Sequence, residues 1–268
     1  IETMYSLKEA KAAVLACKEY DIPIFVTFTI KENGKTFLGE DVLAILISLQ
    51  DLGISAFGLN CCTVDTMLPY IKELSEYSKI PLIAKPCAGE PNLLMPNLYD
   101  LSPTMMAKKI KDLLDCGVTY VGGCCGTTPQ HIAEIRKLLD TYNSNDNIDF
   151  IKDNHDIVLA NTNEVFMLSY DNIEFSDEIN CEIDMTDSFL NAEESGSNIM
   201  LININSVEES LMFADNQYMA KLPVCFRSED ENALKMAIKH YYGKPMVDSD
   251  SSIDNIKKIC LENGAYLY

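Results

Sequence analysis

The alternation of short apolar runs with longer amphipathic segments restricts the fold of this chain more than any other feature. Within residues 1–141, β-branched and aromatic runs predict strands at 24–28, 54–59, 80–84 and 118–121. Apolar spacing near 3.6 predicts helices at 7–20, 41–52, 64–77, 103–115 and 129–139. Short buried strands separated by helices of about 10–15 residues form βαβ units and a parallel sheet. Four such strands amount to half of a (β/α)8 barrel.

The remaining residues repeat this alternation less regularly. Strands are predicted at 157–159, 165–168, 199–204, 222–226, 246–247 and 265–268, and helices at 187–195, 206–215, 230–242 and 252–263. A polar stretch at 142–147 lacks apolar periodicity, as linkers do. Residues 1–140 hold 13 basic and 17 acidic side chains, whereas residues 141–268 hold 8 and 24. We therefore predict two domains, 1–142 and 143–268, the second being part of another β/α barrel.

Charge and composition exclude several classes of function. The net charge of −20 argues against binding to nucleic acid or to an anionic membrane surface, because both require basic patches. The sequence contains no apolar run of the ~18–20 residues that a membrane span needs and no export signal. The ten cysteines include two adjacent pairs, which suit metal binding better than disulfides and indicate a reducing, cytoplasmic compartment. The chain starts at Ile1, so we expect it to be processed or to be a piece of a longer protein.

Several cysteines follow the predicted strands of the first region. Functional groups in β/α barrels lie on the loops after the strands, and here those loops carry Cys61, Cys87 and the pair Cys124 and Cys125. Three thiolates, from Cys61, Cys124 and Cys125, would make a zinc site with one position free for substrate. From their spacing alone, these cysteines are as consistent with buried thiols that bind no metal as with a zinc site. Cys62 and Cys87 are spare candidates for ligation, and the remaining helix and strand cysteines Cys17, Cys116, Cys225 and Cys260 are expected to be packing residues.

One stretch resembles a known family. Residues 122–132, Gly-Gly-Cys-Cys-Gly-Thr-Thr-Pro-Gln-His-Ile, resemble the double-cysteine motif of the homocysteine S-methyltransferase family, and residues 58–61, Gly-Leu-Asn-Cys, resemble its other cysteine motif. The resemblance covers residues 1 to about 141 and implies the C-terminal half of a (β/α)8 barrel. It also implies that Cys61, Cys124 and Cys125 hold a catalytic zinc.

The same resemblance implies an activity and a substrate site. It implies methyl transfer to the thiol of homocysteine, giving methionine, with Glu2 near the substrate amino group and Thr3 beside it. The chain departs from the family at residues 86–89, Pro-Cys-Ala-Gly, where Pro-Asn-Ala-Gly is expected. We interpret His131 as part of a helix start. The alternatives are a non-catalytic zinc-binding or scaffold module with a decayed active site, and a scaffold without metal.

The second region resembles, over a shorter stretch, the pterin-binding barrel that follows the homocysteine barrel in cobalamin-dependent methionine synthases. The best stretch is residues 222–249, yet Asn203, Arg227 and Asp248 replace pterin-pocket residues of that family. We therefore interpret this region as a degenerate folate barrel. The order of the two barrels favours methylcobalamin, on a corrinoid domain or protein outside this chain, as the methyl donor, and a sulfonium compound is the alternative donor.

Overall fold

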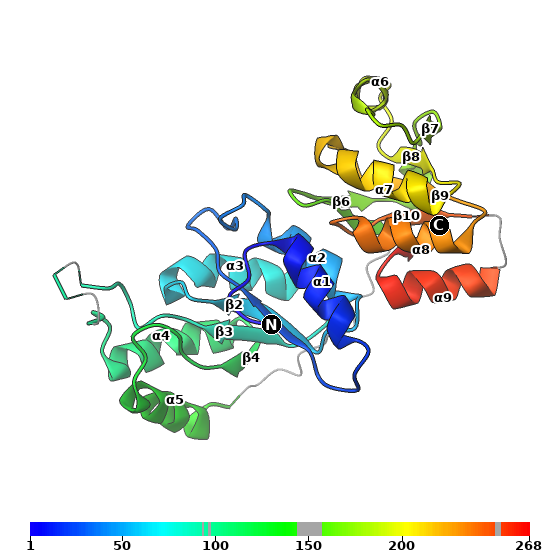
Figure 1. The fold of residues 1–268 in the computed structure, drawn as a ribbon. Helices are drawn as coiled ribbons and strands as arrows, with labels where there is room; N and C mark the ends of the chain where they lie inside the picture. The colour runs from blue at the N-terminus through cyan, green and yellow to red at the C-terminus, as the bar shows by residue number, and fades with distance from the viewer. Residues whose placement is uncertain (93, 96–97, 144–156, 250–252) are drawn as a thin grey trace. The chain divides into compact units, whose positions relative to one another are not determined.

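The computed structural model describes residues 1–92, 94–95, 98–143, 157–249 and 253–268. The chain forms two compact units, residues 1–46 with 54–152 and residues 47–53 with 153–268. Each contains a parallel sheet whose strands are connected by helices (Figure 1). The α/β class with parallel β/α units is therefore confirmed, while the division into two partial barrels stays a prediction. Residues 144–147 of the predicted linker lie outside the described residues.

The first unit contains four parallel strands in chain order across the sheet. They are β1 (Phe25–Phe28), β2 (Ala56–Asn60), β3 (Leu82–Lys85) and β4 (Val118–Val121). The helices of this part of the chain are α1 (Leu7–Cys17), α2 (Val42–Gln50), α3 (Val64–Tyr77), α4 (Pro103–Asp115) and α5 (Pro129–Thr141). Crossovers between parallel neighbours are almost always right-handed, so a sequential strand order places the connecting helices on one face of the sheet. These helices therefore do not cover the opposite face or the carboxyl edge of the sheet.

Side-chain caps determine where the helices begin after the strand-end loops. The N-caps Thr63 and Ser102 accept hydrogen bonds from backbone N–H groups at 3.2 Å and 3.4 Å, which starts α3 and α4. At α5 the Nδ1 atom of His131 accepts from the Thr128 N–H at 3.1 Å, forming a capping box. The Nε2 atom of His131 lies 2.9 Å from the Leu101 carbonyl oxygen. His131 is therefore part of a helix start, as the sequence indicates.

Aromatic side chains of the two outer strands meet on one face of the first sheet. Phe25 in β1 and Tyr120 in β4 have ring centroids 5.0 Å apart, although two strands separate β1 from β4. Neighbouring strands lie about 4.8 Å apart, so the backbones of β1 and β4 would be ~14 Å apart in a flat sheet, and the two side chains extend toward each other over β2 and β3. On the same face, a Cβ at Gly58 would overlap the carbonyl oxygen of Ile83. Close approach of β2 and β3 therefore requires a glycine at this position.

The N-terminal residues pair with β1 as a further strand would. Ile1 accepts a hydrogen bond from the Thr27 N–H at 3.0 Å, and the Met4 N–H donates to the Thr27 carbonyl at 2.9 Å. Met4 and Phe28 form a parallel bridge. This pairing fixes Glu2 and Thr3 beside the carboxyl half of β1.

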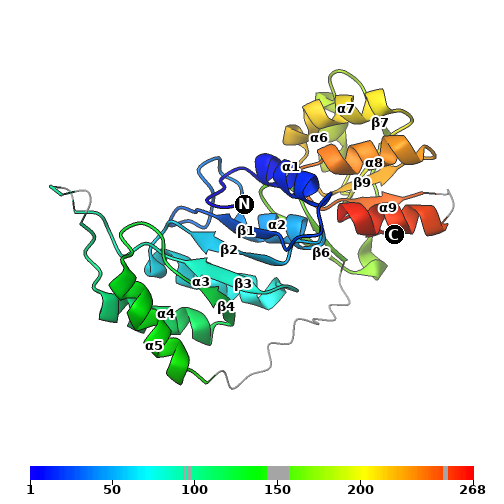
Figure 2. The ribbon, with the colours of Figure 1, turned by 60° about the horizontal axis from the view of Figure 1, so that its bottom comes forward.

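The second unit contains five parallel strands, again in chain order across the sheet. Figure 2 shows this unit with the helices that connect its strands. They are β7 (Ile179–Asn180), β8 (Met200–Asn203), β9 (Val224–Arg227), β10 (Met246–Asp248) and β11 (Tyr266–Leu267). The helices are α6 (Thr186–Glu194), α7 (Val207–Asn216), α8 (Glu231–His240) and α9 (Ile253–Asn263), with short 3-10 turns η1 (Tyr170–Asn172) and η2 (Gln217–Met219). Within the described ranges, no helix has both the length and the apolar character needed to cross a bilayer.

A hairpin covers the second face of this sheet. Strands β5 (Ile157–Ala160) and β6 (Val165–Leu168) are antiparallel partners. Ile157 and Leu159 pack with Leu201, Cys225 and other sheet residues in one apolar cluster. The alternate sheet residues pack with helix side chains in a second cluster. Both faces of the sheet are therefore covered, and the sequence did not predict that these two strands pair with each other.

Candidate metal centre

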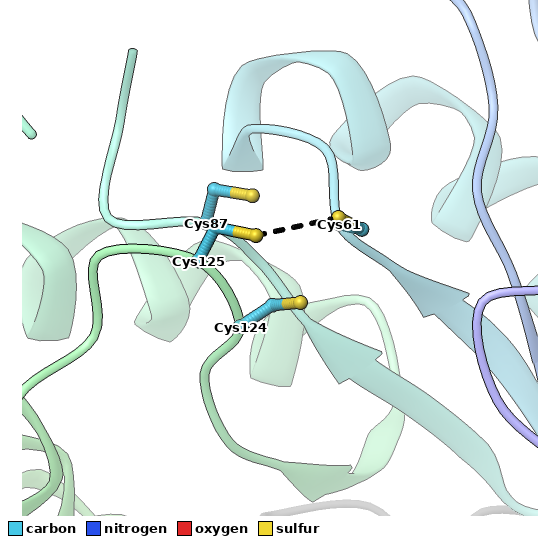
Figure 3. A group of neighbouring side chains, drawn as sticks. All are labelled: Cys61, Cys87, Cys124 and Cys125. Carbon is cyan, nitrogen blue, oxygen red and sulfur yellow. Dashed lines mark hydrogen bonds between the residues drawn. The ribbon is translucent and has the colours of Figure 1, made fainter. Parts of the chain in front are cut away.

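Four cysteine sulfurs converge at the carboxyl edge of the first sheet. Cys61 follows β2 directly, Cys87 lies two residues beyond β3, and Cys124 and Cys125 follow β4. Their Sγ atoms all lie within 4.8 Å of one another. Figure 3 shows the side chains meeting from three separate loops, with Cys61 Sγ and Cys125 Sγ 3.5 Å apart. The carboxyl ends of adjacent parallel strands lie at one edge, which explains why residues distant in sequence meet here.

The backbone of the site is held in place. Cys61 has a φ of 61°, a left-handed conformation that non-glycine residues rarely adopt and that persists only where neighbouring structure imposes it. Its N–H donates to the Lys85 carbonyl at 3.3 Å, and its carbonyl accepts from Thr29 Oγ1 at 3.4 Å. Gly126, with a φ of +74°, turns the chain after the cysteine pair, where a Cβ would overlap the Tyr99 ring.

The electrostatics of the cluster disfavour negative charge in the absence of a cation. Burial raises the pKa of the Cys87 thiol to about 12 and raises that of Cys61 as well. A hydrogen bond from Cys61 lowers the pKa of Cys125, the most exposed member of the cluster. Adjacent buried thiolates repel one another, so a divalent cation is needed to stabilise several of them together.

The donor set and its spacing fit zinc. Zinc binds thiolates at about 2.3 Å with tetrahedral geometry, which separates neighbouring sulfurs by about 3.8 Å. The observed 3.5 Å contact and the 4.8 Å upper limit bracket this separation. The cluster therefore has the composition and the size of a zinc site.

Asn60, at the end of β2, connects the cluster to the N-terminal residues. Its side chain is fully buried, and its Nδ2 atom donates to Thr3 Oγ1 at 2.6 Å and to Cys124 Sγ at 3.8 Å. Its Oδ1 atom has no hydrogen-bond partner among the described residues. Glu2 forms an ion pair with Lys85 at the end of β3. The structure thus brings Glu2 and Thr3 to the edge that carries the cysteines.

A cavity of about 340 Å³ opens beside the cluster. Cys61, Cys87 and Cys125 line it, together with Tyr99 and charged side chains that include Lys31 and Glu32. Its volume lies within the range of small-molecule sites. A small molecule therefore has room to approach the sulfurs from this side.

The structure groups Cys87, a spare candidate in the sequence, with the three cysteines predicted as ligands. The strand-end rule that selected Cys61 and the Cys124–Cys125 pair also selects Cys87, whereas Cys62 is not in the group of four. The roles of Asn60 and Lys85 were not predicted, because hydrogen-bond and ion-pair partners depend on three-dimensional proximity. Among the cysteines expected to be packing residues, Cys225 and Cys260 are buried, but Cys17 and Cys116 are only half-buried.

Polar side chains at the carboxyl ends of the second sheet bind one another. The Arg227 guanidinium lies 2.6 Å from Asp248 and 3.6 Å from Glu178. Asn203 donates to Asn180 at 3.2 Å. These contacts occupy the positions at which the sequence departs from the pterin-binding pattern.

The residues that carry the four clustered cysteines match a known protein family. The model of the homocysteine S-methyltransferase family matches residues 1–139, just over half of the chain. The chain belongs to the homocysteine S-methyltransferase family. The match contains all four clustered cysteines and the N-terminal residues paired with β1.

The relatives of this family member include two methionine synthases. Those of Mycobacterium leprae and Mycobacterium tuberculosis are 36% and 35% identical in alignments over 144 residues, which cover 50% of this chain and 12% of each relative. Among solved structures, the apo homocysteine methyltransferase MmuM from Escherichia coli is similar at 21% identity. That similarity covers 51% of this chain and 47% of the other, with a TM-score of 0.43. The chain thus matches only about an eighth of the length of the curated methionine synthases.

Proposed function

We propose that the protein carrying this chain transfers a methyl group to the thiol of homocysteine and releases methionine. The proposal rests on the four cysteine sulfurs that lie together at the carboxyl edge of the first sheet, within the residues that match this family. In the reaction the homocysteine sulfur forms a bond to the methyl carbon while the bond between that carbon and the donor breaks. The thiol proton leaves to solvent.

Cys61, Cys124 and Cys125 are the proposed ligands of a zinc ion. A bound zinc ion lowers the pKa of a coordinated thiol, so that the nucleophilic thiolate forms at neutral pH. The Asn60 amide orients Cys124 through its N–H···S contact. A thiolate centre of this kind requires a reducing compartment, for which we propose the cytoplasm.

Glu2 and Thr3 are the proposed contacts for the amino acid part of homocysteine. Lys85 holds the Glu2 carboxylate at the edge of the site, where the carboxylate can pair with the substrate ammonium group. Thr3 is fixed by Asn60, and the unpartnered Oδ1 atom of Asn60 offers a further acceptor nearby.

For the methyl donor we propose methylcobalamin on a corrinoid domain or protein outside this chain, with a sulfonium compound as the alternative. The similarity to methionine synthases supports the corrinoid donor. We propose that the second unit does not bind folate. In support, Arg227 and Asp248 pair with each other at the strand ends, and the β5–β6 hairpin covers one face of this sheet.

The test is methionine formation by the full-length protein with homocysteine and each donor in turn. Cys124→Ser removes one proposed ligand, so we expect it to lose zinc and at least ~100-fold of the activity. Cys62→Ser is the matched control, since Cys62 adjoins Cys61 but lies outside the cluster, and it should keep both. Retained activity in Cys124→Ser would reject the assignment of the site.

Cys87 favours a second candidate function, a non-catalytic zinc-binding module. Four cysteines are the ligand set of closed structural zinc sites, whereas catalytic sites keep one position for substrate. A closed site predicts that homocysteine leaves the metal coordination unchanged. A change in coordination on adding homocysteine would favour the enzyme.

A further inference from the structure

The second unit contains a cavity of about 600 Å³. Three segments of this unit form it: the turn of the β5–β6 hairpin, helix α6 and the residues that precede β9. Because residues 218–221 come before β9, the cavity lies at the amino end of that strand, whereas Arg227 and Asp248 lie at the carboxyl ends of their strands. The cavity is therefore separate from the strand-end contacts described above.

Hydrogen bonds between the three segments hold the walls of the cavity in place. The buried Asn161 side chain accepts from the Glu164 N–H at 2.9 Å and donates to the Lys221 carbonyl at 3.1 Å. This joins the hairpin turn to the segment before β9. The Thr186 hydroxyl, at the start of α6, donates to the Met219 sulfur at 3.4 Å. The cavity is thus largely preformed, which reduces the cost of ordering it around a ligand.

One part of the cavity wall is apolar. Phe189 and Ala220 belong to the buried core of the unit and also line the cavity. Leu190 and Tyr218 line it as well, although both side chains are exposed. Covering exposed apolar surface is favourable, so this wall suits a ligand with an apolar group.

Opposite charges lie together in the same cavity. The Lys221 Nζ atom is 2.7 Å from a carboxylate oxygen of Glu193. The Glu193 side chain is 19% exposed and the Lys221 side chain 73% exposed, so opening this pair to a ligand costs little, because exposed ion pairs are weak. Glu164 adds a second carboxylate, which has no ion-pair partner among the described residues.

We propose that this cavity binds a free α-amino acid with an apolar side chain. The ligand ammonium group pairs with the carboxylates of Glu193 and Glu164, and the ligand carboxylate pairs with Lys221. The ligand side chain packs against Leu190 and Tyr218. A zwitterion satisfies both members of the ion pair, whereas a simple anion or cation satisfies one and is repelled by the other. This site does not depend on the function proposed for the first unit.

Equilibrium dialysis of the full-length protein with radiolabelled L-leucine and L-phenylalanine tests the proposal. Neither amino acid carries a sulfur atom that could bind at the metal centre. We expect the two to compete for one site per chain. Lys221→Met removes the partner of the ligand carboxylate and should weaken binding of both at least ~10-fold. Lys235→Met, at an exposed lysine of the same unit, is the matched control and should bind them as the wild type does.

Leucinamide separates recognition of the ligand charges from damage to the cavity. It keeps the ammonium group of leucine but has a neutral amide in place of the carboxylate. It should bind Lys221→Met at least as tightly as the wild type, because no lysine then competes for Glu193. Leu190→Gln, which makes the apolar wall more polar, should weaken the binding of leucine, phenylalanine and leucinamide alike.

Three results would overturn the proposal. The first is that neither amino acid binds the wild type. The second is binding that Lys221→Met and Leu190→Gln both leave unchanged, since the ligand would then lie elsewhere. The third is leucinamide that binds the wild type as tightly as leucine, because Lys221 would then not contact the ligand carboxylate. None of these results bears on the metal centre, which is tested by methionine formation.

Discussion

At the scale of single residues, the site depends on a few buried polar contacts in addition to the sulfurs. Asn60 joins Thr3 to Cys124, and Thr3, like Cys61, adopts a left-handed backbone conformation, with a φ of 59°. Such conformations cost about 1–3 kcal/mol each and are common at functional sites. The hydrogen bonds of Asn60 help to hold one of these two residues in its conformation.

We expect Asn60→Ala to lower the free energy of unfolding by about 1–3 kcal/mol, because it removes a buried side chain and leaves Thr3 Oγ1 without this donor. Chemical denaturation monitored by circular dichroism measures the change. Asn143→Ala, at an exposed asparagine of the same unit, should stay within about 0.5 kcal/mol of the wild type. Equal effects of the two substitutions would contradict the role assigned to Asn60.

At the scale of elements, the sequence predicts the bounds of helices and strands accurately where an N-cap residue or a regular pattern of apolar residues marks them. Helices 64–77 and 103–115 and strand 118–121 were predicted to the residue, because a Thr or Ser N-cap or a β-branched run marks them. Helix α1 ends at Cys17, earlier than the predicted residue 20, since residues 18–20 are exposed and contribute no apolar surface to burial. The two-residue strand β7 was not predicted, because two residues carry no periodicity.

The contact between β2 and β3 gives a prediction at this scale. Gly58→Ala places a methyl group against the Ile83 carbonyl, and strand backbones in a sheet cannot separate without losing hydrogen bonds. We expect a loss of stability of at least ~2 kcal/mol. Gly122→Ala is the control, because a Cβ there meets only the Lys85 side chain at 3.4 Å. Thermal unfolding of both variants measures the difference in stability. A Gly58→Ala variant as stable as the wild type would contradict the close approach of β2 and β3.

Tyr241 gives a pH-dependent prediction for the second unit. It is 2% exposed, its hydroxyl donates to the Ala160 carbonyl at 3.3 Å, and burial raises its pKa. An unfolded tyrosine ionises near pH 10, so the stabilisation is complete below that pH and is lost as pH rises further. Relative to Tyr241→Phe, the wild type should lose up to about 1.4 kcal/mol per pH unit above pH 10. Parallel stability curves from pH 9 to 11 would contradict this.

At the scale of the whole chain, the strands at the edges of the two sheets are expected to determine whether the chain self-associates. β4 and β11 each have one strand neighbour among the described residues, and unpaired strand edges promote association. We therefore expect the isolated 268-residue chain to self-associate. Sedimentation over a range of concentrations measures this, and a monomer at every concentration with one sharp melting transition would contradict it.

The zinc content of the intact parent protein, purified without chelator beside its Cys125→Ser variant, tests the central claim most directly. Cys125 lies 3.5 Å from Cys61 in the cluster, so its removal takes away one proposed thiolate ligand. We expect one zinc per chain in the wild type and loss of that zinc in Cys125→Ser. Absence of zinc from both proteins, or one zinc in each, would contradict the proposed metal centre.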